Sequence, residues 1–270
     1  MKTSIGITGC TGSLGKSLLE NKKKYKFVCF KGDITNKLQI QNWLKYNDFK
    51  ILIHLAAIVP IKDVNKNKKK ALKVNFHGTK NIIDSIKNSN VKWIFFSSTS
   101  HVYQSSKKKI LENDKKKPIS YYGNTKLLAE NYILKKLKNT NIKYCIGRIF
   151  STSNKNQKKN YLVPDLIRKI KKTKKTITLY NLNHYRDFVT MRNISKIILT
   201  LSKKKYNGII NIGRGKQILL KDIAKLICKK YNKNCIFIDN KQPTYLIANT
   251  SKLKKIIKVK FDKKLEDVIL

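Results

Sequence analysis

The stretch TGCTGSLG, residues 8–15, gathers three of the eleven glycines of this 270-residue chain. The apolar run SIGIT (residues 4–8) leads into it, and a segment of helical periodicity follows. Glycine permits a tight turn and a close approach of the backbone to a phosphate, and the first turn of a helix supplies free amides. The spacing is GxxGxxG, and its place between a first strand and a first helix indicates a dinucleotide-binding turn.

Apolar runs that suit buried strands alternate with helical segments through the first 150 residues. Strict alternation predicts an α/β fold of the Rossmann type, a doubly wound parallel sheet with helices on both faces. Beyond residue 150 the rhythm becomes irregular. We therefore expect a nucleotide-binding domain over residues 1–150 and a smaller mixed α/β C-terminal lobe over residues 151–270, with some C-terminal strands returning to the main sheet. The expected strands lie at 4–8, 26–30, 51–57, 91–98 and 144–150, and the helices at 14–20, 38–45, 71–87 and 122–137.

The charge of the chain is extreme, with a formal net charge of +46. A basic excess of this size is typical of proteins that bind nucleic acid or anionic membranes. Here the excess is nearly all lysine scattered along the chain, whereas reading of bases and bidentate phosphate contacts favour arginine. We therefore expect no specific nucleic-acid partner. No run of 18 apolar residues and no signal peptide is recognisable, so we expect a cytoplasmic protein with no membrane partner.

Five cysteines are present, an odd number with no CxxC pair. This pattern favours reduced thiols over a disulfide framework, and we expect no metal site.

Tyr122 and Lys126 lie four positions apart in SYYGNTK (residues 120–126), which continues as a helix pattern. Residues at i and i+4 are neighbours on a helix, so the two polar groups can reach one point. A phenol with a pKa of about 10 is a poor base at neutral pH, and a nearby ammonium lowers that pKa. The pair therefore indicates an acid/base site in which Lys126 tunes Tyr122, although lysine is common enough in this chain for the spacing to be accidental.

Together with the glycine-rich segment, the Tyr122 and Lys126 segment makes the chain resemble the extended short-chain dehydrogenase/reductase family. The resemblance is to its branch of nucleotide-sugar epimerases, dehydratases and reductases. TGCTGSLG resembles the TGxxGxxG turn of that family, and PISYYGNTK resembles its PxSxYGxSK helix. The segments RDFV and GIINIG are similar to elements of its nucleotide-sugar-binding half. The other matching segments, in the family's order, are GDITN (32–36), HLAA (54–57), VNFHGT (74–79) and SSTSHVY (97–103).

The resemblance implies roles for individual residues. Tyr122 would exchange a proton with the substrate oxygen, and Thr99 would donate a hydrogen bond to the same oxygen. Lys126 would lower the pKa of Tyr122 and hold the hydroxyls of the nicotinamide ribose. Arg186 would clamp a diphosphate. The implied catalytic residues are Thr99, Tyr122, Lys126 and His101, and the substrate residues are Thr99, Ser100, Arg186 and Lys241. The implied cofactor-binding residues are Gly9, Thr11, Gly12, Ser13, Leu14, Gly15, Asp33, Ile34, Leu55, Ala56, Ala57, Asn75, Tyr122 and Lys126.

Ser100 and His101 follow Thr99 at the positions where dehydratases of the family carry carboxylates, which argues against elimination of water. By resemblance we expect an NAD(P)-dependent epimerase or 4-keto reductase of a nucleotide-diphosphate sugar, assembled as a homodimer. His101 is a candidate acid/base for an added epimerisation step or a histidine with no role in proton transfer. The alternatives are an NAD(P)-dependent keto-reductase of a non-sugar substrate and a non-catalytic NAD(P)-binding regulator.

The choice between NAD and NADP stays open at this stage. Asp33 lies 24 residues after Gly9, a distance that suits the ribose-binding acid of NAD enzymes. Lys31 lies beside it and would instead suit the 2′-phosphate of NADP.

Overall fold

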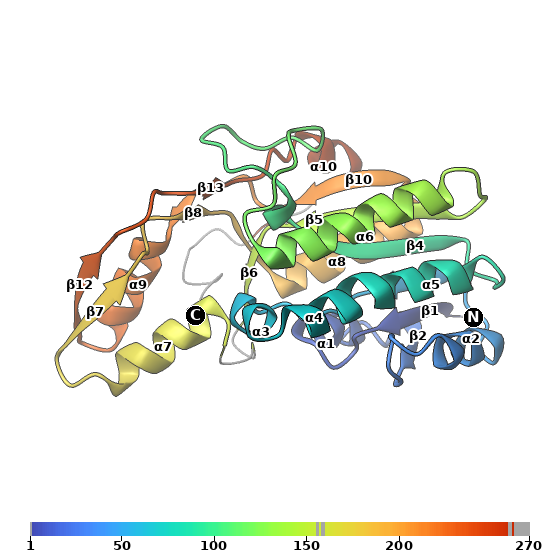
Figure 1. The fold of residues 1–270 in the computed structure, drawn as a ribbon, viewed down its shortest axis with the longest axis horizontal. Helices are drawn as coiled ribbons and strands as arrows, with labels where there is room; N and C mark the ends of the chain where they lie inside the picture. Colours follow the sequence, from blue (N-terminus) through green and yellow to red (C-terminus); the bar gives the residue numbers. More distant parts are fainter. Residues whose placement is uncertain (1, 155–156, 158–159, 259–260, 262–270) are drawn as a thin grey trace.

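Six parallel strands form the central sheet of the computed structural model, which describes residues 2–154, 157, 160–258 and 261 (Figure 1). Each neighbouring pair runs in the same direction, as the alternating pattern predicts. The Rossmann-type α/β fold is therefore confirmed. In spatial order the strands are β10 (Gly208–Ile212), β5 (Lys143–Ile149), β4 (Trp93–Thr99), β3 (Ile51–His54), β1 (Thr3–Thr8) and β2 (Tyr25–Phe30).

Helices cover both faces of this sheet, because side chains of alternate strand residues point to opposite faces. On β4, Trp93 and Phe95 join the core under one face, and Ile94 and Phe96 join the core under the other. The first face carries α1 (Ser13–Leu19), α8 (Met191–Lys203) and α10 (Ser251–Ile256). The second carries α2 (Lys37–Lys45), α5 (Thr79–Ile86) and α6 (Tyr121–Leu137).

The smaller lobe has its own apolar core (Figure 1). Two amphipathic helices, α7 (Leu162–Lys172) and α9 (Leu220–Lys230), pack against the two-stranded parallel sheet of β7 (Thr176–Tyr180) and β12 (Asn234–Ile238). Short strands join this lobe to the central sheet, and the chain returns to that sheet through α8 and β10. These strands are β6 (Ser151–Ser153), β8 (Tyr185–Arg186), β9 (Phe188–Thr190), β11 (Ile218–Leu219) and β13 (Tyr245–Leu246).

The strand order reverses between β1 and β3. The chain passes from β1 to β2 on one side and then crosses back to β3 on the other side of β1. Ligands of open α/β sheets bind outside the carboxyl ends of the strands at such a switch point. The predicted glycine turn follows β1, and the HLAA segment begins at His54, the last residue of β3. Both segments therefore lie at the carboxyl ends of the two strands that flank the switch point.

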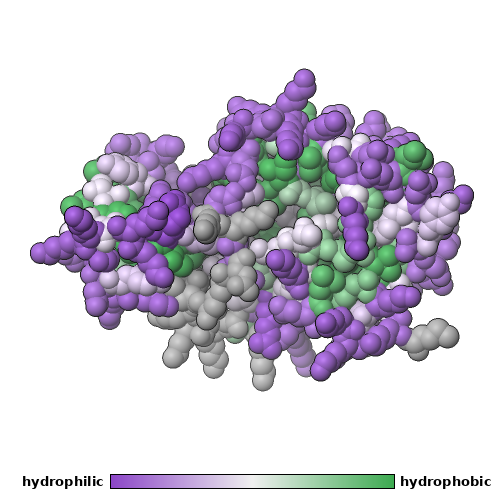
Figure 2. Space-filling model, turned by 90° about the horizontal axis from the view of Figure 1, so that it is seen from below, coloured by the Kyte–Doolittle hydropathy of each residue, from purple (hydrophilic) through white to green (hydrophobic). Residues whose placement is uncertain are grey.

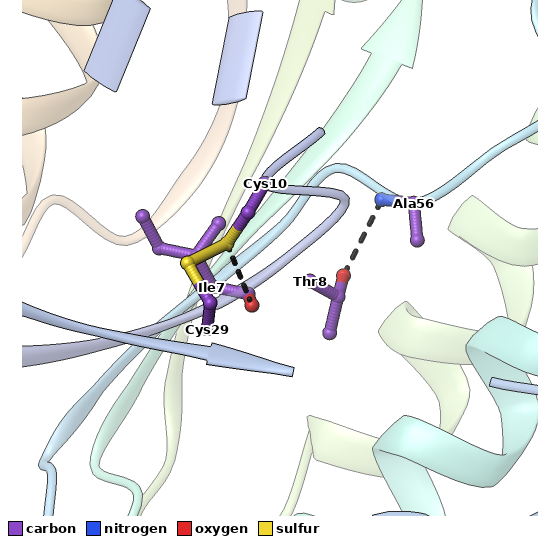
Figure 3. The surroundings of a disulfide bond; sticks show 5 residues. All are labelled: Ile7, Thr8, Cys10, Cys29 and Ala56. Carbon is purple, nitrogen blue, oxygen red and sulfur yellow. Dashed lines mark hydrogen bonds between the residues drawn. A yellow bond between two sulfur atoms is a disulfide. The ribbon is translucent and has the colours of Figure 1, made fainter. Parts of the chain in front are cut away.

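The expectation that all cysteines are reduced is wrong for Cys10 and Cys29, which form a disulfide (Figure 3). Parallel pairing of β1 with β2 places Cys29 opposite Ile7, and the turn after β1 brings Cys10 back beside it, with the two Cα atoms 6.1 Å apart. Nineteen residues of sequence separate the pair, so no local spacing shows it. Cys145, Cys228 and Cys235 are free thiols.

Hydrophilic side chains cover much of the face drawn in Figure 2, on both lobes, which agrees with lysines spread along the chain. Within the ranges that the structure describes, no helix is both long enough and apolar enough to span a bilayer.

Candidate active site

The glycine turn has a conformation that larger residues would disrupt. Gly9 has φ of +80°, and a Cβ added there would lie 2.7 Å from the backbone nitrogen of Ala56. A Cβ at Gly15 would overlap the turn itself, 2.7 Å from Cys10 Cα. Gly12 donates its amide to the Gly9 carbonyl at 3.1 Å. The turn therefore presents bare backbone at the switch point, as a phosphate-binding turn requires, and Thr11, Ser13 and Leu14 lie along it.

His54, at the end of β3, connects this turn to the helices on the second face. Its Nδ1 lies 2.6 Å from Thr8 Oγ1 and its Nε2 lies 3.0 Å from Thr79 Oγ1. Burial, followed by the charge of Lys126, lowers the pKa of His54 to about 3, so the imidazole is neutral. Leu55 donates its amide to the Thr8 carbonyl, and Ala56 donates its amide to Thr8 Oγ1 (Figure 3). Leu55 and Ala56 therefore lie against the glycine turn.

Asn75 lies in the π-helical turn η1 (Lys73–Gly78) and is fully buried. Its amide oxygen accepts from the Ile58 amide at 2.8 Å, and its amide nitrogen donates to the Ile58 carbonyl and to Thr125 Oγ1. Thr125 in turn donates to the Tyr122 carbonyl at 2.8 Å. Through these hydrogen bonds, Asn75 fixes the segment after β3 to α6, the helix that carries Tyr122.

Thr99 and Tyr122 meet where β4 ends and α6 begins. Both are buried, and the Thr99 hydroxyl is near enough to Tyr122 to influence the pKa of its phenol. The Ser120 hydroxyl caps α6 by accepting from the Gly123 amide at 3.1 Å, and a Cβ at Gly123 would lie 2.7 Å from the His101 carbonyl carbon. The cap and this close approach bring the first turn of α6 onto the end of β4. The structure therefore brings together the predicted phenol and threonine.

Burial raises the pKa of Tyr122 well above its usual range. The neighbouring Tyr161 raises it further, and the nearby Thr99 hydroxyl lowers it. Tyr161, which directly precedes α7, was not anticipated from the sequence, because it lies in a segment without a recognisable motif. It places a second, partly buried phenol beside Tyr122.

The role of Lys126 in tuning Tyr122 stays a prediction. Among the described residues, it is not one of the groups that shift the pKa of Tyr122. Its Nζ lies 4.2 Å from the centroid of Phe96, because one helical turn further along α6 the side chain is directed at β4. Burial lowers the pKa of Lys126 to about 7, and the nearby Glu130 opposes that shift.

Glu130 belongs to a buried network that the sequence analysis missed. Arg148 Nη2 lies 2.7 Å from Glu130 Oε2, with both side chains 1% exposed, and Ser98 Oγ donates to the same carboxylate. Arg148 also donates to the Tyr103 hydroxyl at 2.8 Å. Glu130 follows Lys126 by four residues on one helix face, a spacing that was available in the sequence.

Ser100 and His101 form the short helix η2 (Ser100–Val102) directly after Thr99. Ser100 is buried, and the His101 ring lies edge-on to that of Tyr122 with centroids 6.2 Å apart. Its Nδ1 lies 3.0 Å from Ser120 Oγ. Burial, followed by the charge of Arg186, lowers the pKa of His101 to about 4, so the ring is neutral and a weak base. Its role in proton transfer stays a prediction.

Arg186, on β8, is close enough to act electrostatically on His101. It donates to the carbonyls of Tyr185 and Thr244 and to Thr244 Oγ1, all neutral acceptors, and burial lowers its pKa to about 10. Within the described ranges, no carboxylate lies at ion-pair distance from its guanidinium. A half-buried cation without an anionic partner remains available to a diphosphate.

Two neighbours of Arg186 clarify its surroundings. The Asp187 carboxylate turns away and accepts the backbone amides of Arg214, Gly215 and Ala248, so an ion pair between Arg186 and Asp187 is not formed. Lys241 is exposed on the segment between β12 and β13. Burial lowers the pKa of His184, and the charges of Arg186 and Lys241 lower it further, so both cations lie near this histidine.

Asp33 and Ile34 follow β2 at the edge of the sheet. Asp33 is exposed, and its carboxylate accepts the Thr35 amide at 2.8 Å and the Thr35 hydroxyl at 2.9 Å. Ile34 is 6% exposed and belongs to the second core, beneath Gly78. Ile34 therefore shapes this corner of the site from the interior.

Comparison with known proteins assigns the chain to a family. The model of the NAD dependent epimerase/dehydratase family matches residues 5–213. GDP-6-deoxy-D-talose 4-dehydrogenase of Aggregatibacter actinomycetemcomitans is 29% identical, with 94% of this chain and 90% of the relative covered. The dTDP-4-dehydro-6-deoxyglucose reductase of Escherichia coli is 25% identical, with 92% and 88% covered.

Solved structures share the fold. The structure of RMD from Pseudomonas aeruginosa, complexed with NADPH, superposes with a TM-score of 0.89 at 16% identity and covers 99% of this chain and 96% of that one. The match of the family model spans the glycine turn, the Thr99 and Tyr122 pair and the segment around Arg186. The chain therefore belongs to the NAD dependent epimerase/dehydratase family, and it is an NAD(P)-dependent enzyme of the extended short-chain dehydrogenase/reductase type.

Proposed function

We propose that this enzyme reduces the 4-keto group of a nucleotide-activated sugar, or oxidises the corresponding 4-hydroxyl in reverse. The observation that carries the proposal is the buried, neighbouring pair of Thr99 and Tyr122, with the cation of Arg186 within electrostatic range of the adjacent His101. The hydroxyls of Thr99 and Tyr122 suit a reacting oxygen, and the guanidinium of Arg186 suits a diphosphate.

The glycine turn and the segment Leu55–Ala57 would hold the dinucleotide, since bare backbone at the switch point leaves room for its phosphates. When bound, a nicotinamide dinucleotide supplies or accepts the hydride, and the protein supplies position and electrostatic environment. Lys126 and Tyr122 would lie next to it, as the resemblance implies.

Tyr122 would transfer the proton in this reaction. Because burial keeps its pKa high, the phenol is protonated at neutral pH, which is the form needed to donate a proton to the oxygen of a ketone that is being reduced. The Thr99 hydroxyl would donate a hydrogen bond to the same oxygen, whose charge grows during the reaction. In the reverse direction Tyr122 would take the proton back.

Reduction fits this site better than elimination of water. Elimination needs an acid/base after Thr99, and there the chain has buried Ser100 and a His101 whose pKa is lowered to about 4. Two of the relatives are named as a 4-dehydrogenase and a 4-keto reductase of nucleotide-activated deoxysugars. Epimerisation at carbon 4 needs the same residues and differs in that it consumes no dinucleotide.

Thermal melts test the substrate class, because a ligand bound only by the native state raises its stability. We expect stabilisation by at least one of the UDP-, GDP-, dTDP- and CDP-sugars, and oxidation of reduced dinucleotide when the matching 4-keto sugar is added. An epimerase would instead convert substrate with no net change in dinucleotide absorbance.

The Arg186→Gln variant separates this function from reduction of a non-sugar ketone. Loss of a charge-assisted diphosphate contact should weaken nucleotide-sugar binding about 100-fold, roughly 3 kcal/mol. The control is Arg192→Gln, which removes an exposed arginine on α8. Calorimetry that finds equal nucleoside-diphosphate affinity in both variants would reject the clamp.

A further inference from the structure

We propose that Lys31 binds the 2′-phosphate of NADP, and that the enzyme therefore prefers NADP to NAD. The inference rests on the dinucleotide site proposed above. It assigns a specificity role to an exposed lysine that has no part in the reaction.

The register of the sheet places Lys31 beside the glycine turn. Strands β1 and β2 are parallel neighbours, and their pairing ends with Thr8 opposite Phe30. Gly9 and Lys31 are therefore the first residues to leave these two neighbouring strands, at the same end of the sheet. In Rossmann folds the residue that reads the 2′ position of the adenosine ribose lies next to the phosphate-binding turn, at the end of the second strand.

The disulfide holds this arrangement together (Figure 3). Cys10 directly follows Gly9, and Cys29 precedes Lys31 by two residues. The covalent link between them ties the phosphate-binding turn to the strand that carries Lys31, so the distance from the turn to the lysine is constrained.

The charges around this corner favour a phosphate over a hydroxyl pair. A ribose with free 2′- and 3′-hydroxyls is best held by a carboxylate, whereas an ammonium only donates hydrogen bonds and carries a positive charge. Asp33 is the carboxylate at this corner, and both of its oxygens accept hydrogen bonds from Thr35. The Thr35 hydrogen bonds lower the pKa of Asp33, and the nearby charges of Lys73 and Lys70 lower it further, so cations already offset its negative charge.

Affinity for the two oxidised dinucleotides tests the proposal without any substrate. Calorimetry at low ionic strength should give NADP a dissociation constant at least about 10-fold below that of NAD. The difference should shrink in 0.5 M salt, because an exposed pairing of charges is screened. Lys31→Glu should reverse the preference by weakening NADP more than about 30-fold while leaving NAD within about threefold.

The matched control is Lys26→Glu, which makes the same charge change on an exposed residue of β2 at the opposite end of the strand. We expect it to retain the preference of the wild type. Equal weakening of NADP by the two variants would assign the effect to net charge and overturn the role of Lys31. Equal affinity of the wild type for NAD and NADP would also overturn it, whereas failure of both dinucleotides to bind would reject the proposed function itself.

Discussion

The pKa of Tyr122 is set by the residues around it in the fold. Its position four residues before Lys126 is visible in the sequence, but the groups that set its pKa are its own burial, Tyr161 and Thr99. The lysine that was expected to tune it packs on Phe96 and lies near Glu130. Spacing on a helix shows which residues share a face, and the packing of that face decides which of them interact.

The Tyr122→Phe variant tests the central role at the residue scale. Removal of a positioned acid should lower kcat by about a thousandfold, within the usual range for loss of general acid catalysis. Because only the hydroxyl is lost, dinucleotide binding measured by calorimetry should persist. Tyr121→Phe removes the neighbouring hydroxyl and should retain turnover. Unimpaired turnover in Tyr122→Phe would refute the assigned proton donor.

At the scale of elements, the disulfide joins the turn after β1 to β2, two segments that would otherwise be held by strand pairing and side-chain packing. It also lies beside the proposed dinucleotide site, so its effect on stability and its effect on cofactor binding can be measured in the same samples.

Breaking this link should destabilise the protein. A disulfide that closes a loop of this size typically contributes about 2–4 kcal/mol, which corresponds to roughly 4–8 °C in the Tm of a protein of this length. We expect dithiothreitol to lower the Tm of the wild type by that amount and to leave the Tm of the Cys10→Ser/Cys29→Ser double variant unchanged. Titration of the unfolded, unreduced wild type should find three thiols. Five would show that the bond is absent.

For the whole molecule, buried neutral groups predict a dependence of stability on pH. The native pKa of His54 is about 3, below its value of about 6.5 in an unfolded chain. Between these values the unfolded state binds a proton that the native state does not, so stability is present above pH 6.5 and falls with decreasing pH. The slope for one such group is about 1.4 kcal/mol per pH unit.

Urea unfolding between pH 7 and pH 4 measures this slope. His54→Gln keeps a donor and an acceptor but cannot titrate, so its free energy of unfolding should fall less steeply with acid by about one proton. His77→Gln, which changes an exposed histidine on η1, should retain the slope of the wild type. An unchanged slope in His54→Gln would contradict the neutral, buried state of His54.

Much of the architecture was predictable from the sequence. The alternation of apolar runs with helical segments matches the order of β1 to β5 and their helices, because burial of a strand or a helix face leaves a local periodic pattern. The glycine turn was predictable for a similar reason, since φ of +80° at Gly9 and the close approach of Ala56 exclude larger residues.

The fold class and the location of the glycine turn were thus determined by the sequence alone, because each leaves a local pattern: alternating apolar and helical segments for the fold, and closely spaced glycines for the turn. Only the tertiary structure decided that Cys10 meets Cys29, that Lys126 lies over Phe96 and that Tyr161 borders Tyr122. These contacts join segments brought together by strand register, by the packing of α6 on β4 and by the packing of one lobe on the other. Their energies depend on burial and on the partners present, which no spacing within a single segment records.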